Sequence, residues 1–96
     1  MNKIVTIINR EIEDFHRTAA YKALFMYNYG YYIVSGTYSG GDLNGRPKIM
    51  VFPANKKGEV IDWHEMYAYY PCQLNWAEID KAIMLSLDNI DERYYI

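Results

Sequence analysis

Residues 4–27, IVTIINREIEDFHRTAAYKALFMY, decide the fold of this 96-residue chain. Apolar side chains recur in this stretch every three or four residues, which is the spacing of one face of an α-helix. The members of this stripe are Ile4, Ile8, Ile12, Phe15, Ala19, Ala23 and Met26. Because Gly30 follows and glycine commonly ends helices, the spacing predicts a helix from Ile4 to about Tyr27.

Three strands are expected after this helix. Tyr31 to Tyr38 and Lys48 to Phe52 are rich in aromatic and β-branched residues, which favours strands. The Asn-Lys-Lys-Gly stretch that ends at Gly58 is typical of a hairpin turn with a left-handed glycine. A third strand is expected from about Glu59 to Met66, although the apolar spacing of residues 63–70 also fits a helical turn.

The C-terminal part of the chain has the clearest helical pattern. Asn75 is a preferred N-cap residue, and Glu78 follows three positions later, as in a capping box. The predicted buried stripe of this helix consists of Trp76, Ile79, Ile83, Leu87 and Ile90. The resulting order is α-β-β-β-α, so we expect an α+β fold with a three-stranded antiparallel sheet and two helices packed on one face. At this length, residues 1–96 should form a single compact domain.

The composition excludes several classes of protein. A chain with 51% hydrophobic and 23% charged residues is expected to be globular rather than disordered. Cys72 is the single cysteine, so no intrachain disulfide is expected, and no apolar run approaches the roughly 20 residues that span a bilayer. The net charge of −2, without a basic cluster, argues against binding to a long nucleic acid. We therefore expect a cytoplasmic protein that does not bind membranes.

No motif in the chain specifies a chemistry. Glu13 and His16 form one Glu-x-x-His pair, whereas carboxylate-bridged metal sites use two such pairs. Cys72 is a candidate nucleophile only if His16 or His64 lies beside it. The glycines within residues 36–45 do not have the spacing of a phosphate-binding loop. We expect a protein that is not an enzyme and has neither a metal nor a cofactor.

The eleven tyrosines are the strongest functional signal in the chain. A small core buries few phenol hydroxyls, because each buried hydroxyl needs a hydrogen-bond partner. Several rings should therefore lie half exposed, and such rings are common where proteins meet their partners. The residues predicted to bind a protein partner through this surface are Tyr31, Tyr38, Leu43, Tyr67, Tyr69 and Tyr70.

Three acidic residues lie near the C-terminal end of the last predicted helix: Asp88, Asp91 and Glu92. The helix dipole disfavours negative charge at that end. Two interpretations follow. Either the helix ends before these residues, which are then simply solvated, or they form an acidic patch that steers a partner with a basic surface. We include the patch in the predicted partner-binding surface.

Three functions remain, of which the third, an enzyme that uses His16, His64 or Cys72, requires those groups to lie within a few ångströms of one another. The first is a small non-enzymatic protein-binding module, an inhibitor or adaptor; its general profile resembles that of many phage-encoded inhibitors of host defence, so a viral protein is expected by analogy. The alternative is a protein that binds or sequesters a nucleotide by stacking it on Tyr31 and Tyr38, with Arg46 and Lys48 nearby. In both cases we expect a homodimer, because a second copy would cover an open aromatic sheet face.

Overall fold

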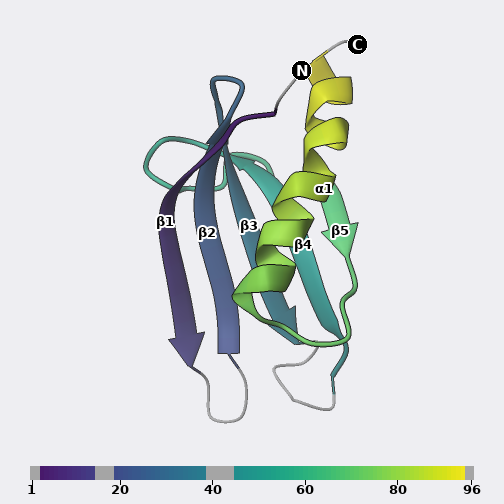
Figure 1. The fold of residues 1–96 in the computed structure, drawn as a ribbon. Coiled ribbons are helices and arrows are strands. Elements are labelled where there is room, and N and C mark those ends of the chain that lie inside the picture. Colours follow the sequence, from purple (N-terminus) through teal and green to yellow (C-terminus); the bar gives the residue numbers. More distant parts are fainter. Residues whose placement is uncertain (1–2, 15–18, 39–44, 95–96) are drawn as a thin grey trace.

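The computed structural model describes residues 3–14, 19–38 and 45–94. Within these residues, five antiparallel strands lie side by side in the order of the sequence, and one helix crosses one face of the sheet (Figure 1). The elements are β1 (Val5–Asp14), β2 (Ala19–Tyr27), β3 (Gly30–Tyr38), β4 (Pro47–Ala54), β5 (Tyr67–Tyr69) and α1 (Trp76–Tyr94). The fold is α+β as expected, but the prediction of three strands and two helices is wrong.

The predicted N-terminal helix is instead the hairpin of β1 and β2. Gly30, which was expected to end a helix, begins β3 after a tight turn. The two turn residues, Asn28 and Tyr29, have positive φ angles of 51° and 68°. A two-residue hairpin turn of type I′ requires positive φ at both positions, so this turn matches the right-handed twist of the flanking strands.

A β-bulge in β1 explains the misleading helical spacing. The register between β1 and β2 shifts between Ile7 and Asn9. Ile7 lies opposite Phe25, and Arg10 lies opposite Ala23, so both face α1 although Arg10 is three positions after Ile7. A regular strand would place only every second residue on that face. The predicted helical stripe is therefore not a buried face, and three of its members are 76%, 46% and 50% exposed: Ile4, Ile8 and Ile12.

The strands after residue 30 follow the prediction in part. β3 and β4 confirm the first two predicted strands, and Gly58 has the predicted positive φ, at 84°. The third predicted strand is wrong. Val60 forms only an isolated bridge with Ala54, residues 61–66 have no regular structure, and β5 begins at Tyr67.

α1 confirms the predicted C-terminal helix. The side-chain oxygen of Asn75 accepts a hydrogen bond from the backbone N–H of Glu78 at 2.9 Å, so Asn75 caps the helix. Trp76 is half-buried. The rest of the predicted stripe is between 0% and 2% exposed: Ile79, Ile83, Leu87 and Ile90. Because the helix continues to Tyr94, the interpretation that it ends before the three acidic residues is wrong.

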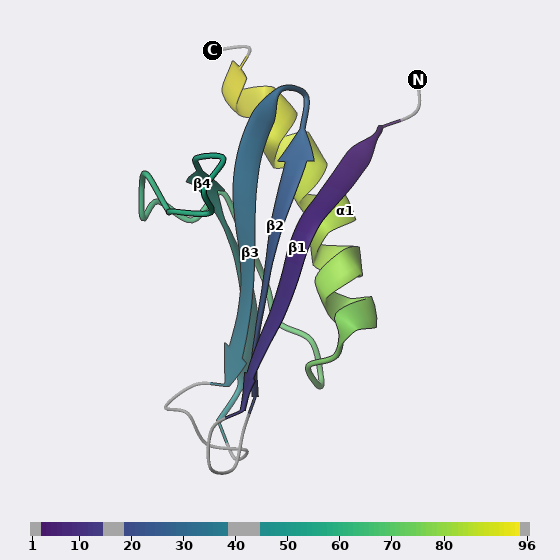
Figure 2. The same ribbon diagram turned by 90° about the vertical axis from the view of Figure 1, so that its left-hand side faces the viewer.

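The main core lies between α1 and the sheet, which Figure 2 shows nearly edge-on with the helix on one side. Apolar residues of β2, β3 and β4 meet the buried stripe of α1 there; Phe25 and Tyr32, for example, have ring centroids 5.5 Å apart. A smaller cluster of Leu24, Ile33 and Ala54 lies on the other face, which we call the open face. The segment after β4 lies on this side of the sheet (Figure 2). It leaves the open face only partly covered.

Candidate functional site

The segment between β4 and β5 presents exposed apolar side chains. The backbone N–H of Ile61 donates to Pro53 O at 3.1 Å, and that of Met66 donates to Val51 O at 2.8 Å. The segment is thus attached to β4 at both ends. Between these two hydrogen bonds the segment advances five positions, from Ile61 to Met66, whereas β4 advances only two, from Val51 to Pro53. The middle of the segment must therefore loop away from β4. Ile61 is 65% exposed and Trp63, in the middle of the loop, is 75% exposed.

Trp63 rests on one aromatic neighbour. Its indole meets the ring of Phe52 edge-on, with centroids 5.4 Å apart and an angle of 68° between the ring planes. Phe52 itself is only 6% exposed, so it forms a fixed base for the indole. The rest of the indole lies in water. A single exposed apolar side chain is ordinary, but neighbouring exposed ones are typical of interaction sites, and Ile61, two residues away, is exposed as well.

Tyr70 marks the other end of this surface, where two cations gather over one ring. Cζ of Arg46 lies 4.7 Å from the centroid of the Tyr70 ring, and Nζ of Lys48 lies 5.7 Å from it. Tyr70 is 50% exposed. Lys48 also forms an ion pair with Glu65 at 2.9 Å, and this hydrogen bond is the main cause of the raised pKa of the Lys48 amine. No carboxylate of the described residues forms an ion pair with Arg46.

These side chains lie on or beside β4, and we call the region that they make up the β4-edge surface. It consists of Arg46, Lys48, Ile61, Trp63, Glu65 and Tyr70. Phe52, beneath Trp63, and Lys48, beside Tyr70, are four residues apart on β4, which corresponds to about 13 Å. One end of the surface is therefore apolar, and the other end is aromatic and positively charged.

The predicted partner-binding tyrosines do not form one face. Tyr31 packs on the small cluster of the open face. Three others are half-buried and pack against the main core on the α1 side: Tyr38, Tyr67 and Tyr69. Tyr70 alone of this predicted set lies on the β4-edge surface. Leu43 lies outside the described residues. Tyr67 and Tyr69 face α1 because they pair with Val51 and Ile49 of β4, which belong to the main core.

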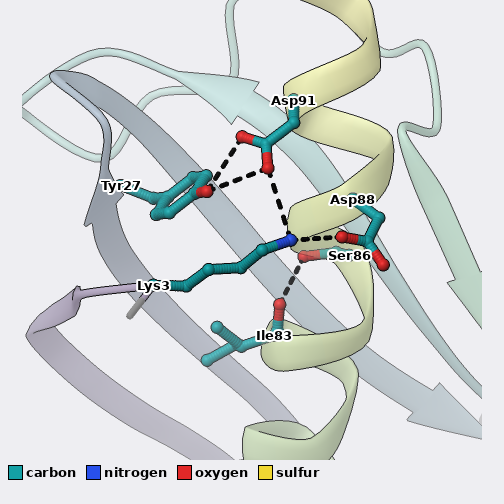
Figure 3. Close-up of polar contacts among 6 residues, drawn as sticks. All are labelled: Lys3, Tyr27, Ile83, Ser86, Asp88 and Asp91. Carbon is teal, nitrogen blue, oxygen red and sulfur yellow. Dashed lines mark hydrogen bonds and ion pairs between the residues drawn. The ribbon is translucent and has the colours of Figure 1, made fainter. Parts of the chain in front are cut away.

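The predicted acidic patch is bound into the fold (Figure 3). The hydroxyl of Tyr27 donates to both carboxylate oxygens of Asp91, at 2.8 and 3.0 Å. Lys3 forms ion pairs with Asp88 and, at 3.3 Å, with Asp91. The positive charge of Lys3 offsets the unfavourable interaction of these acids with the helix dipole. The side chain of Asp88 remains 79% exposed, and Glu92 is also exposed.

The described residues contain few of the features that catalysis or ligand enclosure requires. They hold no group of three or more His, Cys, Asp or Glu side chains that could bind a metal ion. His64 and Cys72 are exposed, whereas His16 lies outside the described residues. A shallow pocket of about 70 Å³ opens between Lys22, Leu24 and Gly58. Sites for small organic ligands usually measure roughly 300–1,000 Å³, so this pocket is too small for a nucleotide.

Sequence reasoning identified only part of the β4-edge surface. Tyr70, Arg46 and Lys48 were predicted to bind a partner or ligand, but Ile61 and Trp63 fall within the predicted third strand and were not predicted to bind. The signal that pointed to Trp63 is its position between two polar residues, Asp62 and His64.

No helix of the described residues is both long and apolar enough to cross a membrane. No protein family, no curated protein and no solved structure matches this chain.

Proposed function

We propose that this chain is a small non-enzymatic protein-binding module, an inhibitor or adaptor, that binds its partner through the β4-edge surface. The observation that best supports this function is the 75% exposed indole of Trp63 on the same surface as Tyr70 and Arg46. Trp, Tyr and Arg are the residue types that most often dominate the energy of protein interfaces. A non-enzymatic role is also consistent with the absence of a catalytic motif in the sequence.

The residues of this surface have different roles in the proposed complex. Trp63 and Ile61 bury apolar area against the partner, and the Phe52 ring restricts the motion of the indole, which lowers the entropy cost of binding. Tyr70 and Arg46 add a polar anchor at the other end. The exposed carboxylates of Asp88 and Glu92 contribute only long-range attraction of a basic partner, an effect that physiological salt screens beyond about 8 Å.

Capture of the partner by the tagged protein from host lysate, quantified by mass spectrometry, tests this function. We expect Trp63→Ala combined with Tyr70→Ala to reduce recovery of a stoichiometric partner at least about tenfold, because truncation of an interface hot spot to alanine costs about 2 kcal/mol or more. Tyr29→Ala is the matched control, since Tyr29 is 96% exposed at the tip of the β2–β3 hairpin. Equal recovery by the folded double variant and the wild type would contradict the proposal.

Nucleotide binding is a second candidate function. Arg46 and Lys48, two of the four residues predicted for this role, converge on the exposed ring of Tyr70, which can stack on a base. Tyr31 and Tyr38 lie on opposite faces of the sheet and do not join them. A nucleotide would therefore lie on an open platform rather than in a pocket. Titration with ATP and GTP distinguishes the two functions: binding that Tyr70→Ala abolishes would favour this candidate.

A further inference from the structure

We infer that the positively charged end of the β4-edge surface is a carboxylate-binding site, so that the protein partner presents an Asp or Glu side chain to Arg46 and an apolar side chain to Trp63. This inference rests on the proposed function and specifies the chemistry of the partner. It assigns to Arg46 the polar contact of the interface and to Trp63 the apolar contact.

A similar arrangement within the chain shows how such a site is filled. Arg10 lies over the ring of Trp76, with Cζ 5.3 Å from the centroid, and forms an ion pair with Asp80 at 2.9 Å. Arg46 lies over the ring of Tyr70 in the same manner, at 4.7 Å. The described residues supply Arg10 with a carboxylate but supply none to Arg46. The partner would therefore contribute the acid that completes the second arrangement.

The chemistry of the guanidinium favours a carboxylate. Contact with the Tyr70 ring orients the planar guanidinium and leaves its N–H groups at the edge free to donate, and a carboxylate can accept two of them at once. Glu65 already neutralises Lys48 at 2.9 Å. Among the described residues, Arg46 is thus the charge at this end of the surface that has no ion-pair partner, and it is exposed, so a partner can reach it without rearrangement of the fold.

The length of the surface sets the spacing of the two contacts. About 13 Å separates the strand positions that support Trp63 and Tyr70, and an extended chain advances roughly 3.3 Å per residue. A partner segment in extended conformation would therefore carry its apolar residue and its acidic residue about four positions apart. This spacing distinguishes the inference from general attraction between the protein and any acidic molecule.

Selection of a random peptide library on the immobilised protein tests the site. We expect the wild type to enrich peptides with an Asp or Glu about four positions from a large apolar residue. Arg46→Glu should bind these peptides about tenfold more weakly or worse, since it replaces a charge-assisted hydrogen bond with repulsion. Lys56→Glu is the matched control, because it makes the same change of charge at an exposed position in the turn after β4 and should leave binding within about twofold. Glu65→Gln should strengthen binding, because it frees Lys48.

The possible failures are distinguishable. Enriched peptides that bind through Trp63 but show no preference for acidic residues, or that bind Arg46→Glu and the wild type equally, would overturn the carboxylate site and leave the proposed function standing. If the wild type enriches no peptide while its folded structure is intact, the proposed function and this inference both fail. Arg46→Gln, which removes the charge without reversing it, should show an intermediate loss if the contact is as inferred.

Discussion

Tyr27 shows what the buried tyrosines of this chain do for the fold. Its ring is 8% exposed within the main core, and its hydroxyl donates to Asp91 near the C-terminal end of α1. Lys3, which precedes β1, reaches the same carboxylate. Three parts of the chain that are distant in sequence are therefore joined at one cluster (Figure 3). A tyrosine that the composition marks as a possible binding residue is here a structural one.

We expect Tyr27→Phe to change how stability depends on pH. The pKa of Tyr27 is raised, first by burial and then by the hydrogen bond to Asp91. Because the pKa in the folded state exceeds the unfolded value of about 10, this group's contribution is complete below pH 10 and is lost as the pH rises through the raised pKa. At pH 8 the variant should be about 1 kcal/mol less stable than the wild type, since it lacks the hydrogen bond.

Urea denaturation of both proteins between pH 8 and pH 11 measures this effect. The difference in the free energy of unfolding should shrink as the pH rises above about 10. The amine of Lys3, whose pKa is raised chiefly by its hydrogen bond to Asp88, also titrates in this range. It is present in both proteins, so its direct contribution largely cancels in the comparison. If the difference in the free energy of unfolding between the two proteins is constant from pH 8 to pH 11, ionisation of the Tyr27 hydroxyl does not affect stability.

The candidate site was predictable only as separate residues. Tyr70, Arg46 and Lys48 are recognisable in the sequence by residue type, but their meeting depends on the pairing of β4 with β5. β5 has only three residues, too few for a periodic pattern to reveal a strand. The exposure of Trp63 depends on a segment with no regular structure, and periodicity cannot place the side chains of such a segment.

At the scale of elements, the N-terminal hairpin shows where apolar spacing fails. Five consecutive β-branched residues occupy positions 4–8, a composition that favours a strand. The bulge between Ile7 and Asn9 interrupts the alternation that would have shown the strand. β2 adds to the ambiguity because Leu24 and Phe25, on opposite faces, are both buried. α1 was predictable because it has a capping residue and one regular buried face.

Gly36 determines how closely α1 can approach β3. A Cβ atom at this position would lie 2.8 Å from Cδ1 of Ile79 and 3.3 Å from a methyl carbon of Leu74. Ile79 is 0% exposed, so its methyl group has little room to move. We expect Gly36→Ala to destabilise the fold by about 1 kcal/mol or more, as overpacking of a core commonly does. Chemical denaturation monitored by circular dichroism measures the change.

A double-mutant cycle shows whether the contact with Ile79 causes this loss. Ile79→Val removes the methyl group that the new Cβ would meet, and alone it should cost about 0.5–1.5 kcal/mol. In the Gly36→Ala background the same substitution should cost less, because it relieves the overlap. Additive costs would mean that the helix moves as a whole, or that the strand itself is disturbed.

At the scale of the whole molecule, the two sides of the sheet are unequal. α1 covers one face completely enough to exclude water from the core, whereas the open face is covered only in part. β1 is a ten-residue edge strand, but its bulge and the charged side chains of Arg10, Glu11 and Glu13 protect it from pairing with another strand. Ile61 and Trp63 of the β4-edge surface are 65% and 75% exposed, more than Ile8 and Ile12 of β1, so we expect association on that side of the molecule.

We therefore expect two copies of the chain to cover each other's β4-edge surfaces when no partner is present. The surface can pair with itself, because the exposed indole of Trp63 lies at one end and the Arg46 guanidinium lies over Tyr70 at the other. A two-fold axis through its middle would set the indole of each copy against the guanidinium of the other, and a guanidinium binds the face of an indole. Sedimentation velocity should show a monomer–dimer equilibrium that Trp63→Lys shifts to monomer, because the new cation would meet Arg46 of the other copy. Tyr29→Lys, an equal change of charge at an exposed ring away from the surface, should leave the equilibrium unchanged. If the wild type stays monomeric at millimolar concentration, the dimer is excluded. If a partner binds without dissociating the dimer, the dimer contact and the partner contact lie on different surfaces.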